Sequence, residues 1–150
     1  MKILSFFFLG FVSLSAFADQ QPYLTKYSAS GFVPIEWSRS DKCEVFESEV
    51  LMTRTYARSA VHYRIPFSAE DSLNEMIGKA QGERIKLEDN YMCDGPSTTI
   101  KARFVAEGSE ESQEILLYST GGCGSPKKVR VGPYSSALVD IASTFCPTTH

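Results

Sequence analysis

The sequence predicts an α+β domain: a mostly antiparallel sheet of about five to six strands, with two helices packed on it and disulfides bracing it. Three observations indicate this class. Several segments alternate apolar and polar residues with the period of a half-buried strand. Two segments, at about 68–81 and 134–145, repeat apolar residues with the period of a helix. An even set of cysteines follows an export signal, which predicts disulfides.

The export signal occupies the first 18 residues. Lys2 is a one-charge n-region, residues 3–14 are an apolar h-region, and Ala16-Phe17-Ala18 matches a cleavage site. A membrane-spanning helix needs about 20 apolar residues, and no segment of the chain approaches that length. We therefore expect cleavage after Ala18, a secreted or periplasmic protein, and no transmembrane segment in the mature chain. The sequence then divides into an N-terminal arm, residues 19–42, and a single α+β domain, residues 43–150.

The first half of the mature chain contains the first predicted strands. Residues 32–37 could form a short strand of the arm. Trp37, the only tryptophan, could be a recognition aromatic, but it is expected to pack in the core or at its edge, because aromatic residues dominate core burial. The run at 44–57 is rich in Val, Thr and Tyr, which favour strands. A turn at Arg58-Ser59 leads to a half-buried strand whose apolar side chains alternate with polar ones: Val61, Tyr63, Ile65 and Phe67.

Residues 68–81 change to a helical period. Ser68 and Asp71 resemble a capping box at the start of this helix, and Gly82 can end it. Its apolar face is formed by Leu73, Met76, Ile77 and Ala80.

Beyond Gly82 the pattern returns to strands. A meander of neighbouring strands is predicted at about 85–92, 98–105 and 114–119, followed by a short strand at 128–131. The last helix, 134–145, has the clearest pattern in the chain. Its polar face includes Ser135 and Ser136, and its apolar stripe is Tyr134, Ala137, Leu138, Ile141, Ala142 and Phe145.

The four cysteines of the mature chain allow three disulfide pairings. In a meander, Cys93 and Cys123 follow strands that end at the same edge of the sheet. We therefore prefer the pairing Cys93–Cys123, which leaves Cys43–Cys146 to tie the final helix to the sheet. The spacings lack the close pairs that zinc sites use, so no metal is expected.

The segment TGGCGSPKK at 120–128 contains a candidate contact loop. Its glycines suit a tight turn stapled by Cys123, because glycine tolerates positive φ. Two lysines follow, and with Arg130 they could capture an anion or an acidic partner, or could simply be a solvated strand face. The candidate contact residues are Gly121, Gly122, Gly124, Lys127 and Lys128.

Catalytic motifs are scarce in this sequence. No nucleophile elbow, zinc-protease motif, phosphate-binding loop or cofactor motif occurs. His62 lies on the polar side of its predicted strand, where a surface histidine is the simplest interpretation. Carboxylates could still support hydrolysis, and Glu44, Glu47 and Glu49 cluster in the sequence, as do Glu88 and Asp89.

The residues YMCDGPSTTIKARF at 91–104 resemble the strand–turn–strand of bacterial membrane-bound lysozyme inhibitors of the C type. The Ser-Gly-x-x-Tyr recognition loop of that family is not evident here, so no residue role is carried over.

Composition also bears on function. The net charge of −3 argues against a nucleic-acid partner, which favours a concentrated basic face. The sequence favours an exported, non-enzymatic binding or inhibitor-like domain for a protein or glycan of the envelope or extracellular space. The alternative is a small exported hydrolase that uses carboxylates, and no cofactor is expected for either.

Overall fold

A computed structural model of the chain describes residues 21–68, 72–90, 93–105, 111–121 and 124–148. Within these residues the chain forms eight strands, two α-helices and a short 3-10 helix. The helices are η1 (Ile35–Trp37), α1 (Leu73–Gln81) and α2 (Pro133–Phe145). The strands are β1 (Leu24–Ala29), β2 (Arg39–Val45), β3 (Glu49–Tyr56), β4 (Ser59–Pro66), β5 (Arg84–Glu88), β6 (Ser97–Val105), β7 (Ser112–Ser119) and β8 (Lys127–Val131).

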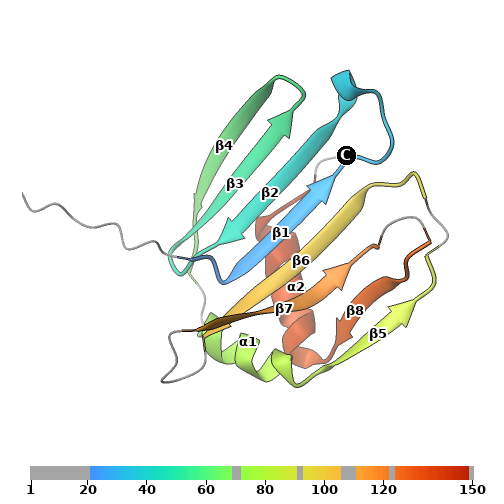
Figure 1. Ribbon diagram of the computed structural model, residues 1–150. Coiled ribbons are helices and arrows are strands. Elements are labelled where there is room, and N and C mark those ends of the chain that lie inside the picture. Colours follow the sequence, from blue (N-terminus) through green and yellow to red (C-terminus); the bar gives the residue numbers. More distant parts are fainter. Residues whose placement is uncertain (1–20, 69–71, 91–92, 106–110, 122–123, 149–150) are drawn as a thin grey trace, which may run out of the picture.

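The strands form one sheet with the order β4-β3-β2-β1-β6-β7-β8-β5, and every neighbouring pair is antiparallel. Both helices lie on the same side of this sheet (Figure 1). The predicted α+β class is confirmed, although the strand count exceeds the expected five to six. One reason is β1, which occupies the centre of the sheet although its residues belong to the predicted arm. Another is the run at 44–57, which a turn at 46–48 divides between β2 and β3.

The predicted meander of 85–92, 98–105 and 114–119 is wrong in its first strand. β5 does not pair with β6; it pairs with β8 at the edge of the sheet, while β6 lies between β1 and β7. The burial of the strands explains this placement. β6 carries the buried residues Ile100 and Ala102, which suit a central position, whereas Ile85 and Leu87 of β5 stay exposed.

The core lies between the helices and one face of the sheet. α1 packs against α2 and β6, and α2 also contacts β1, β7 and β8. Leu138 and Ala142 of α2 are fully buried, as are Ile77 and Ala80 of α1. The predicted stripe of α2 therefore faces the core, with Tyr134 at its exposed end.

The start of each helix is held by a contact that the sequence did not predict. α1 starts at Leu73, and Ser72 caps it by accepting a hydrogen bond from the backbone N–H of Glu75 at 3.5 Å. Ser68 therefore does not cap α1, and Asp71 lies outside the described residues. In α2, Ser135 is fully buried rather than on the polar face, because its hydroxyl and its N–H both donate to the carboxylate of Glu83.

Glu83 and Arg130 tie the two helices to the strands at the end of the sheet where α2 begins. The Glu83 carboxylate accepts backbone N–H groups of Tyr134 at 3.1 Å and of Ser135 at 2.8 Å, so it caps the start of α2 from outside the helix. Arg130 donates to the carbonyl oxygens of Ala80 and Gln81 at the end of α1. These contacts satisfy helix ends that would otherwise be unpaired.

β4 is exposed along its whole length, so the prediction of a half-buried strand is wrong. Its apolar residues Val61, Tyr63 and Ile65 do share one face, and the register places them on the helix side of the sheet. They stay accessible because the helices pack mainly against strands further along the sheet. Only Phe67, just beyond β4, enters the core, where its ring meets Phe145 edge-to-face at 5.0 Å.

Candidate functional site

The helix side of the sheet changes from apolar to polar along its central strands. Residues that face one another in antiparallel strands point to the same side of a sheet, so the register defines rows across β6, β1, β2 and β3. One row is apolar and buried: Ala102, Leu24, Val45 and Val50. Two rows further along the same face, the row is polar: Thr98, Ser28, Asp41 and Arg54.

The disulfide Cys43–Cys146 marks the boundary between the apolar and polar parts of this face. α2 ends at Phe145, and the next residue, Cys146, is bonded to Cys43 of β2 with Cα atoms 5.8 Å apart. β2 extends beyond Cys43 through Asp41 to Arg39, so its polar part runs on past the end of the helix. The predicted tie between the final helix and the sheet is thus present.

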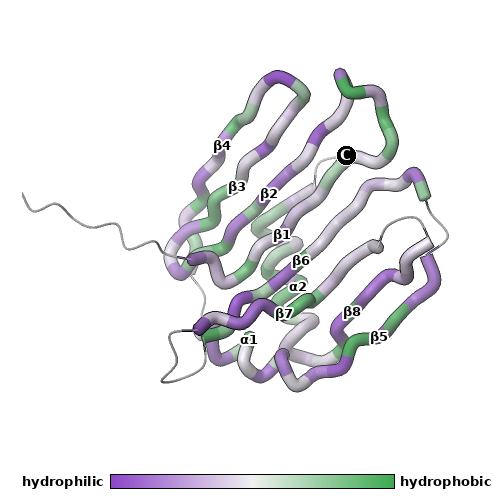
Figure 2. The backbone as a smooth tube through the Cα atoms, viewed as in Figure 1, coloured by the Kyte–Doolittle hydropathy of each residue, from purple (hydrophilic) through white to green (hydrophobic). Residues whose placement is uncertain are grey.

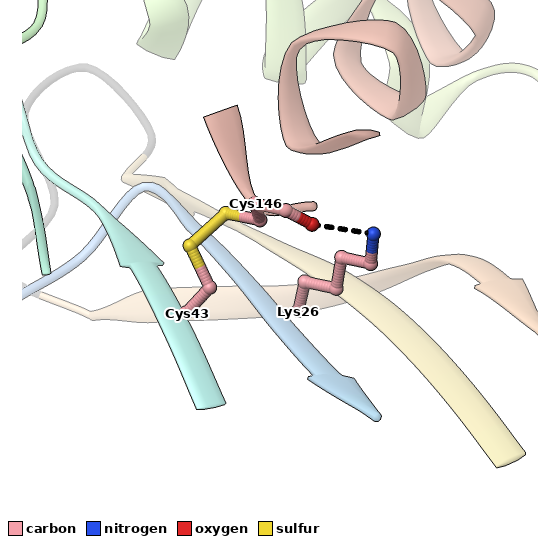
Figure 3. The surroundings of a disulfide bond; sticks show 3 residues. All are labelled: Lys26, Cys43 and Cys146. Carbon is pink, nitrogen blue, oxygen red and sulfur yellow. Dashed lines mark hydrogen bonds between the residues drawn. A yellow bond between two sulfur atoms is a disulfide. The ribbon is translucent and has the colours of Figure 1, made fainter. Parts of the chain in front are cut away.

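Lys26 reinforces this boundary. It lies opposite Cys43 in the register, is buried, and donates from Nζ to the carbonyl oxygen of Cys146 at 2.7 Å (Figure 3). A cation is favourable there because the C-terminal end of a helix carries partial negative charge. Burial lowers the pKa of Lys26, and the charge of Asp41 acts in the opposite direction. Disulfide and lysine together fix the position of Pro147 and Thr148, which follow the helix.

The polar row is held by its own ion pairs. Arg54 donates from Nε to Oδ1 of Asp41 at 2.9 Å and from Nη2 to Oδ2 at 3.4 Å. Nη2 of Arg39 lies 3.6 Å from Oδ2 of the same carboxylate. The hydrogen bond to Asp41 is the main reason that the pKa of Arg54 is raised. Both oxygens of Asp41 are therefore engaged by arginine.

A pocket of about 540 Å³ opens over this polar row. Its lining includes Ser28, Asp41 and Thr98 from the row, and Arg39 from the row beyond. Trp37 and Tyr56 supply aromatic side chains, 74% and 41% exposed, and Thr148 contributes from the C-terminal segment. The volume falls within the range of about 300–1,000 Å³ that is typical of small-molecule sites. Trp37 therefore does not pack in the core or at its edge, and the prediction that it does is wrong.

Trp37 belongs to an exposed connection between β1 and β2, residues 31–37, which we call the apolar loop. Figure 2 shows it as a hydrophobic segment at the end of the sheet beyond the helices. Its exposed apolar side chains are Phe32 (92%), Val33 (41%), Ile35 (78%) and Trp37. Exposed apolar groups that gather in one place typically mark a contact surface. Residues 35–37 form η1, so the predicted strand at 32–37 is wrong.

Local hydrogen bonds shape the apolar loop. The N–H of Phe32 donates to the carbonyl oxygen of Asp94 at 3.3 Å, and the N–H of Trp37 donates to that of Pro34 at 2.9 Å. Gly31 lies so close to the turn at 94–95 that a Cβ atom there would be 2.0 Å from the Asp94 oxygen. Glycine is therefore required for this approach, and the loop is seated against the β5–β6 connection.

The candidate contact loop lies at the same end of the sheet but outside this pocket. Gly121 and Gly124 adopt the positive φ expected of them, 72° and 71°, while Gly122 and Cys123 lie outside the described residues. Gly121 and Cys93 line a second hollow of about 420 Å³ together with Phe32. The preferred pairing of Cys93 with Cys123 stays a prediction, as does the role of this loop in contacts.

The basic residues after that loop serve other contacts. Nζ of Lys127 lies 3.0 Å from Glu88 and 5.5 Å from the centre of the Tyr118 ring. The hydrogen bond to Glu88 is the main cause of the raised pKa of Lys127. Lys128 is exposed on β8. Arg130 is engaged at the end of α1, so the predicted basic patch does not gather all three side chains.

The clustered carboxylates pair with neighbouring bases. Lys42 binds Glu44 at 2.7 Å, Arg64 binds Glu49 at 3.3 Å, and Lys86 binds Glu88 at 3.0 Å. Glu47 is exposed, and Nδ1 of His62 lies 3.1 Å from the Thr53 hydroxyl on the surface of the β3–β4 hairpin. The pocket instead brings together Asp41 and Glu36. In the part of the chain that the structure describes, no His, Cys, Asp or Glu group suits a metal ion.

Comparisons with known proteins return no match: no family model, no curated protein and no solved structure is similar to this chain. Among the residues described by the structure, no helix is long and apolar enough to cross a membrane.

The sequence did contain signals for this site. Phe32, Val33, Ile35 and Trp37 occur beside Gly31 and Pro34, which disfavour a regular strand. Charged residues also interrupt the inward positions of β1 and β2, at Lys26 and Asp41. A charge on the core side of a strand indicates either a paired cluster or a site, and the register is needed to see that these residues lie in adjacent rows.

Proposed function

We propose that the chain is a non-enzymatic binding domain that acts outside the cytoplasm. It recognises a protein or glycan of the envelope or extracellular space with the pocket and the apolar loop. One observation carries this proposal: exposed aromatic side chains, above all Trp37, stand beside a pocket with a preformed polar floor. Rigid loops at the end of a sheet are common places for recognition.

The charges of the pocket support binding rather than hydrolysis. General acid–base catalysis needs a carboxylate within hydrogen-bond reach of the reacting group. Asp41 is instead held by Arg54 and Arg39, and its ion pair to Arg54 is as short as 2.9 Å. Such an arrangement organises the floor of a binding site.

The disulfide supports the proposed compartment. Cys43 and Cys146 are 103 residues apart in the sequence, and such structural disulfides persist in oxidising environments. The secretory signal proposed for residues 1–18 leads to the same compartment, secreted or periplasmic.

Binding to an envelope fraction tests the proposal. The tagged protein, residues 19–150, is incubated with washed envelope material, and the bound fraction is measured for the wild type and for a Phe32→Ser/Trp37→Ser variant. We expect the variant to bind at least about tenfold more weakly, because apolar side chains dominate such contacts. Circular dichroism of each variant confirms that it folds.

Leu87→Ser is the matched control. Leu87 is 61% exposed on β5, the strand next to β8 at the edge of the sheet, so the variant removes an exposed apolar group outside the pocket and the apolar loop. It should bind like the wild type. Equal binding by the loop variant and the wild type would place the contact surface elsewhere and contradict the proposal.

A further inference from the structure

The aromatic groups of the pocket indicate which class of ligand it suits. Trp37 and Tyr56 come from different elements, η1 and the end of β3, and both line the same hollow. The face of an aromatic ring is electron-rich. The C–H bonds on one face of a sugar ring are polarised in the opposite sense, so sugars stack on exposed aromatic rings of this kind.

The polar groups of the pocket offer both donors and acceptors. Hydroxyls of Ser28, Ser38 and Thr98 line it, together with the guanidinium of Arg39 and the carboxylates of Asp41 and Glu36. A hydroxyl can both donate and accept, a guanidinium only donates, and a carboxylate only accepts. Sugar hydroxyls can use this mixture, whereas an acyl chain would take these polar groups out of water and offer them no hydrogen bonds, at a cost in free energy.

The charges around the pocket do not favour an anionic ligand. The charged residues that line the pocket are one arginine, Arg39, and two carboxylates, Asp41 and Glu36. Arg54, the neighbour of Asp41 in the polar row, is paired with that carboxylate. The two arginines balance the two carboxylates, so a phosphate or carboxylate would find no excess of positive charge to attract it.

The pocket is also preformed. Asp41 is held by two arginines, Thr148 is positioned by the disulfide and Lys26, and Gly31 is seated against the 94–95 turn. A site that is already ordered loses little conformational entropy when it binds. Weak stacking and hydroxyl contacts can then give measurable affinity.

We infer that the pocket between the apolar loop, the ends of β1–β3 and the C-terminal segment binds a neutral oligosaccharide, with sugar rings stacked on Trp37 and Tyr56. This inference rests on the proposed binding function and names the class of ligand for the pocket. Phe32 and Ile35 are left for contacts beyond the sugar.

Intrinsic fluorescence tests the inference directly, because Trp37 is the only tryptophan in the sequence. The folded protein is titrated with chitotetraose, cellotetraose, maltotetraose and laminaritetraose up to about 10 mM, and with tetragalacturonate as an acidic comparator. We expect at least one neutral tetrasaccharide to change the Trp37 emission in a saturable way, and the acidic one to bind more weakly. Tighter binding of tetragalacturonate than of every neutral sugar would overturn the inference.

Two tyrosine variants separate the pocket from the rest of the surface. Tyr56→Ala removes one stacking ring and should weaken binding of the responsive sugar by about tenfold. Tyr27→Ala removes a similarly exposed tyrosine, 46% accessible, from the opposite face of β1, and should leave the affinity unchanged. Equal loss in both variants, or in neither, would contradict stacking in the pocket.

The two proposals fail in different ways. If no neutral sugar perturbs Trp37 while envelope material is still captured through Trp37, and a protease abolishes that capture, then the partner is a protein. The sugar inference is then wrong and the binding function stands. If neither sugars nor envelope material depend on Trp37, both proposals are wrong.

Discussion

The two halves of the helix-side sheet face are built on the same strands but have opposite chemistry. Toward the start of α2, the central strands present Leu24, Val45 and Val50, which the helices bury completely. Toward the end of α2, β1 and β2 present Ser28 and Asp41, which line a pocket. A strand can thus contribute to the core in one half and to a site in the other, and the end of the covering helix decides where the change occurs.

The largest expected effect comes from breaking the boundary between the halves. The double variant Cys43→Ala/Cys146→Ala should lower the free energy of unfolding by about 4–5 kcal/mol, because the disulfide closes a loop of about 100 residues in the unfolded chain. Urea denaturation of the variant and the wild type measures this change. An unchanged midpoint would show that the disulfide does not constrain the unfolded state as this model assumes.

A pair of aliphatic truncations compares the covered half with the exposed end. Leu138→Ala removes a fully buried side chain of α2 and should cost about 3 kcal/mol. Ile35→Ala removes a side chain that is 78% exposed in the apolar loop and should change stability by less than about 0.5 kcal/mol. Thermal and urea unfolding measure both. Similar costs at the two positions would mean that the apolar loop packs against the domain.

The stability of the polar half should depend on the ion pair between Asp41 and Arg54. Arg54→Met leaves the Asp41 carboxylate, whose side chain is 8% exposed, with Arg39 at 3.6 Å. We expect a loss of about 2 kcal/mol, because a buried charge without its closest partner is costly. Adding Asp41→Asn should recover part of this loss, since it removes the uncompensated charge. A double-mutant cycle with no coupling energy would contradict the role of this pair.

The smallest effect is a pH dependence at the start of α2. Burial would raise the pKa of Glu83, but hydrogen bonds from Ser135 and Tyr134 and the charge of Arg130 outweigh it and lower the pKa. A depressed pKa means that the ionised cap stabilises the fold at pH values above the unfolded pKa of about 4.3, and that this stability is lost as the pH falls through the folded value.

Glu83→Gln should therefore lower stability by about 1 kcal/mol at pH 7, and the difference from the wild type should vanish in acid below the folded pKa. Urea midpoints of both proteins across the acid range measure it. Glu49→Gln is the control, because Glu49 forms an exposed pair with Arg64. A Glu83→Gln difference that grows as the pH falls would contradict the sign.

Local patterns predicted the elements whose cause is local. The stripe of α2 is visible as a repeat of apolar residues, and its buried positions Leu138 and Ala142 follow that repeat. Gly121 and Gly124 have the positive φ that their turn suggests. The same kind of pattern failed for β4, where the alternation of Val61, Tyr63 and Ile65 is real but the two helices pack mainly against other strands of the sheet.

The sequence by itself determined the α+β class, the helix stripes and the presence of turns, because each depends on residues close together in the chain. Only the tertiary structure decided that β5 pairs with β8, that Glu83 caps a helix some 50 residues away, and that Asp41, which pairs with Arg54, lines one pocket with Trp37 and Tyr56. Periodicity reports which side chains share a face. Contacts between distant segments decide which strand lies beside a given strand and where the helix that covers their shared face ends. Those contacts create the pocket.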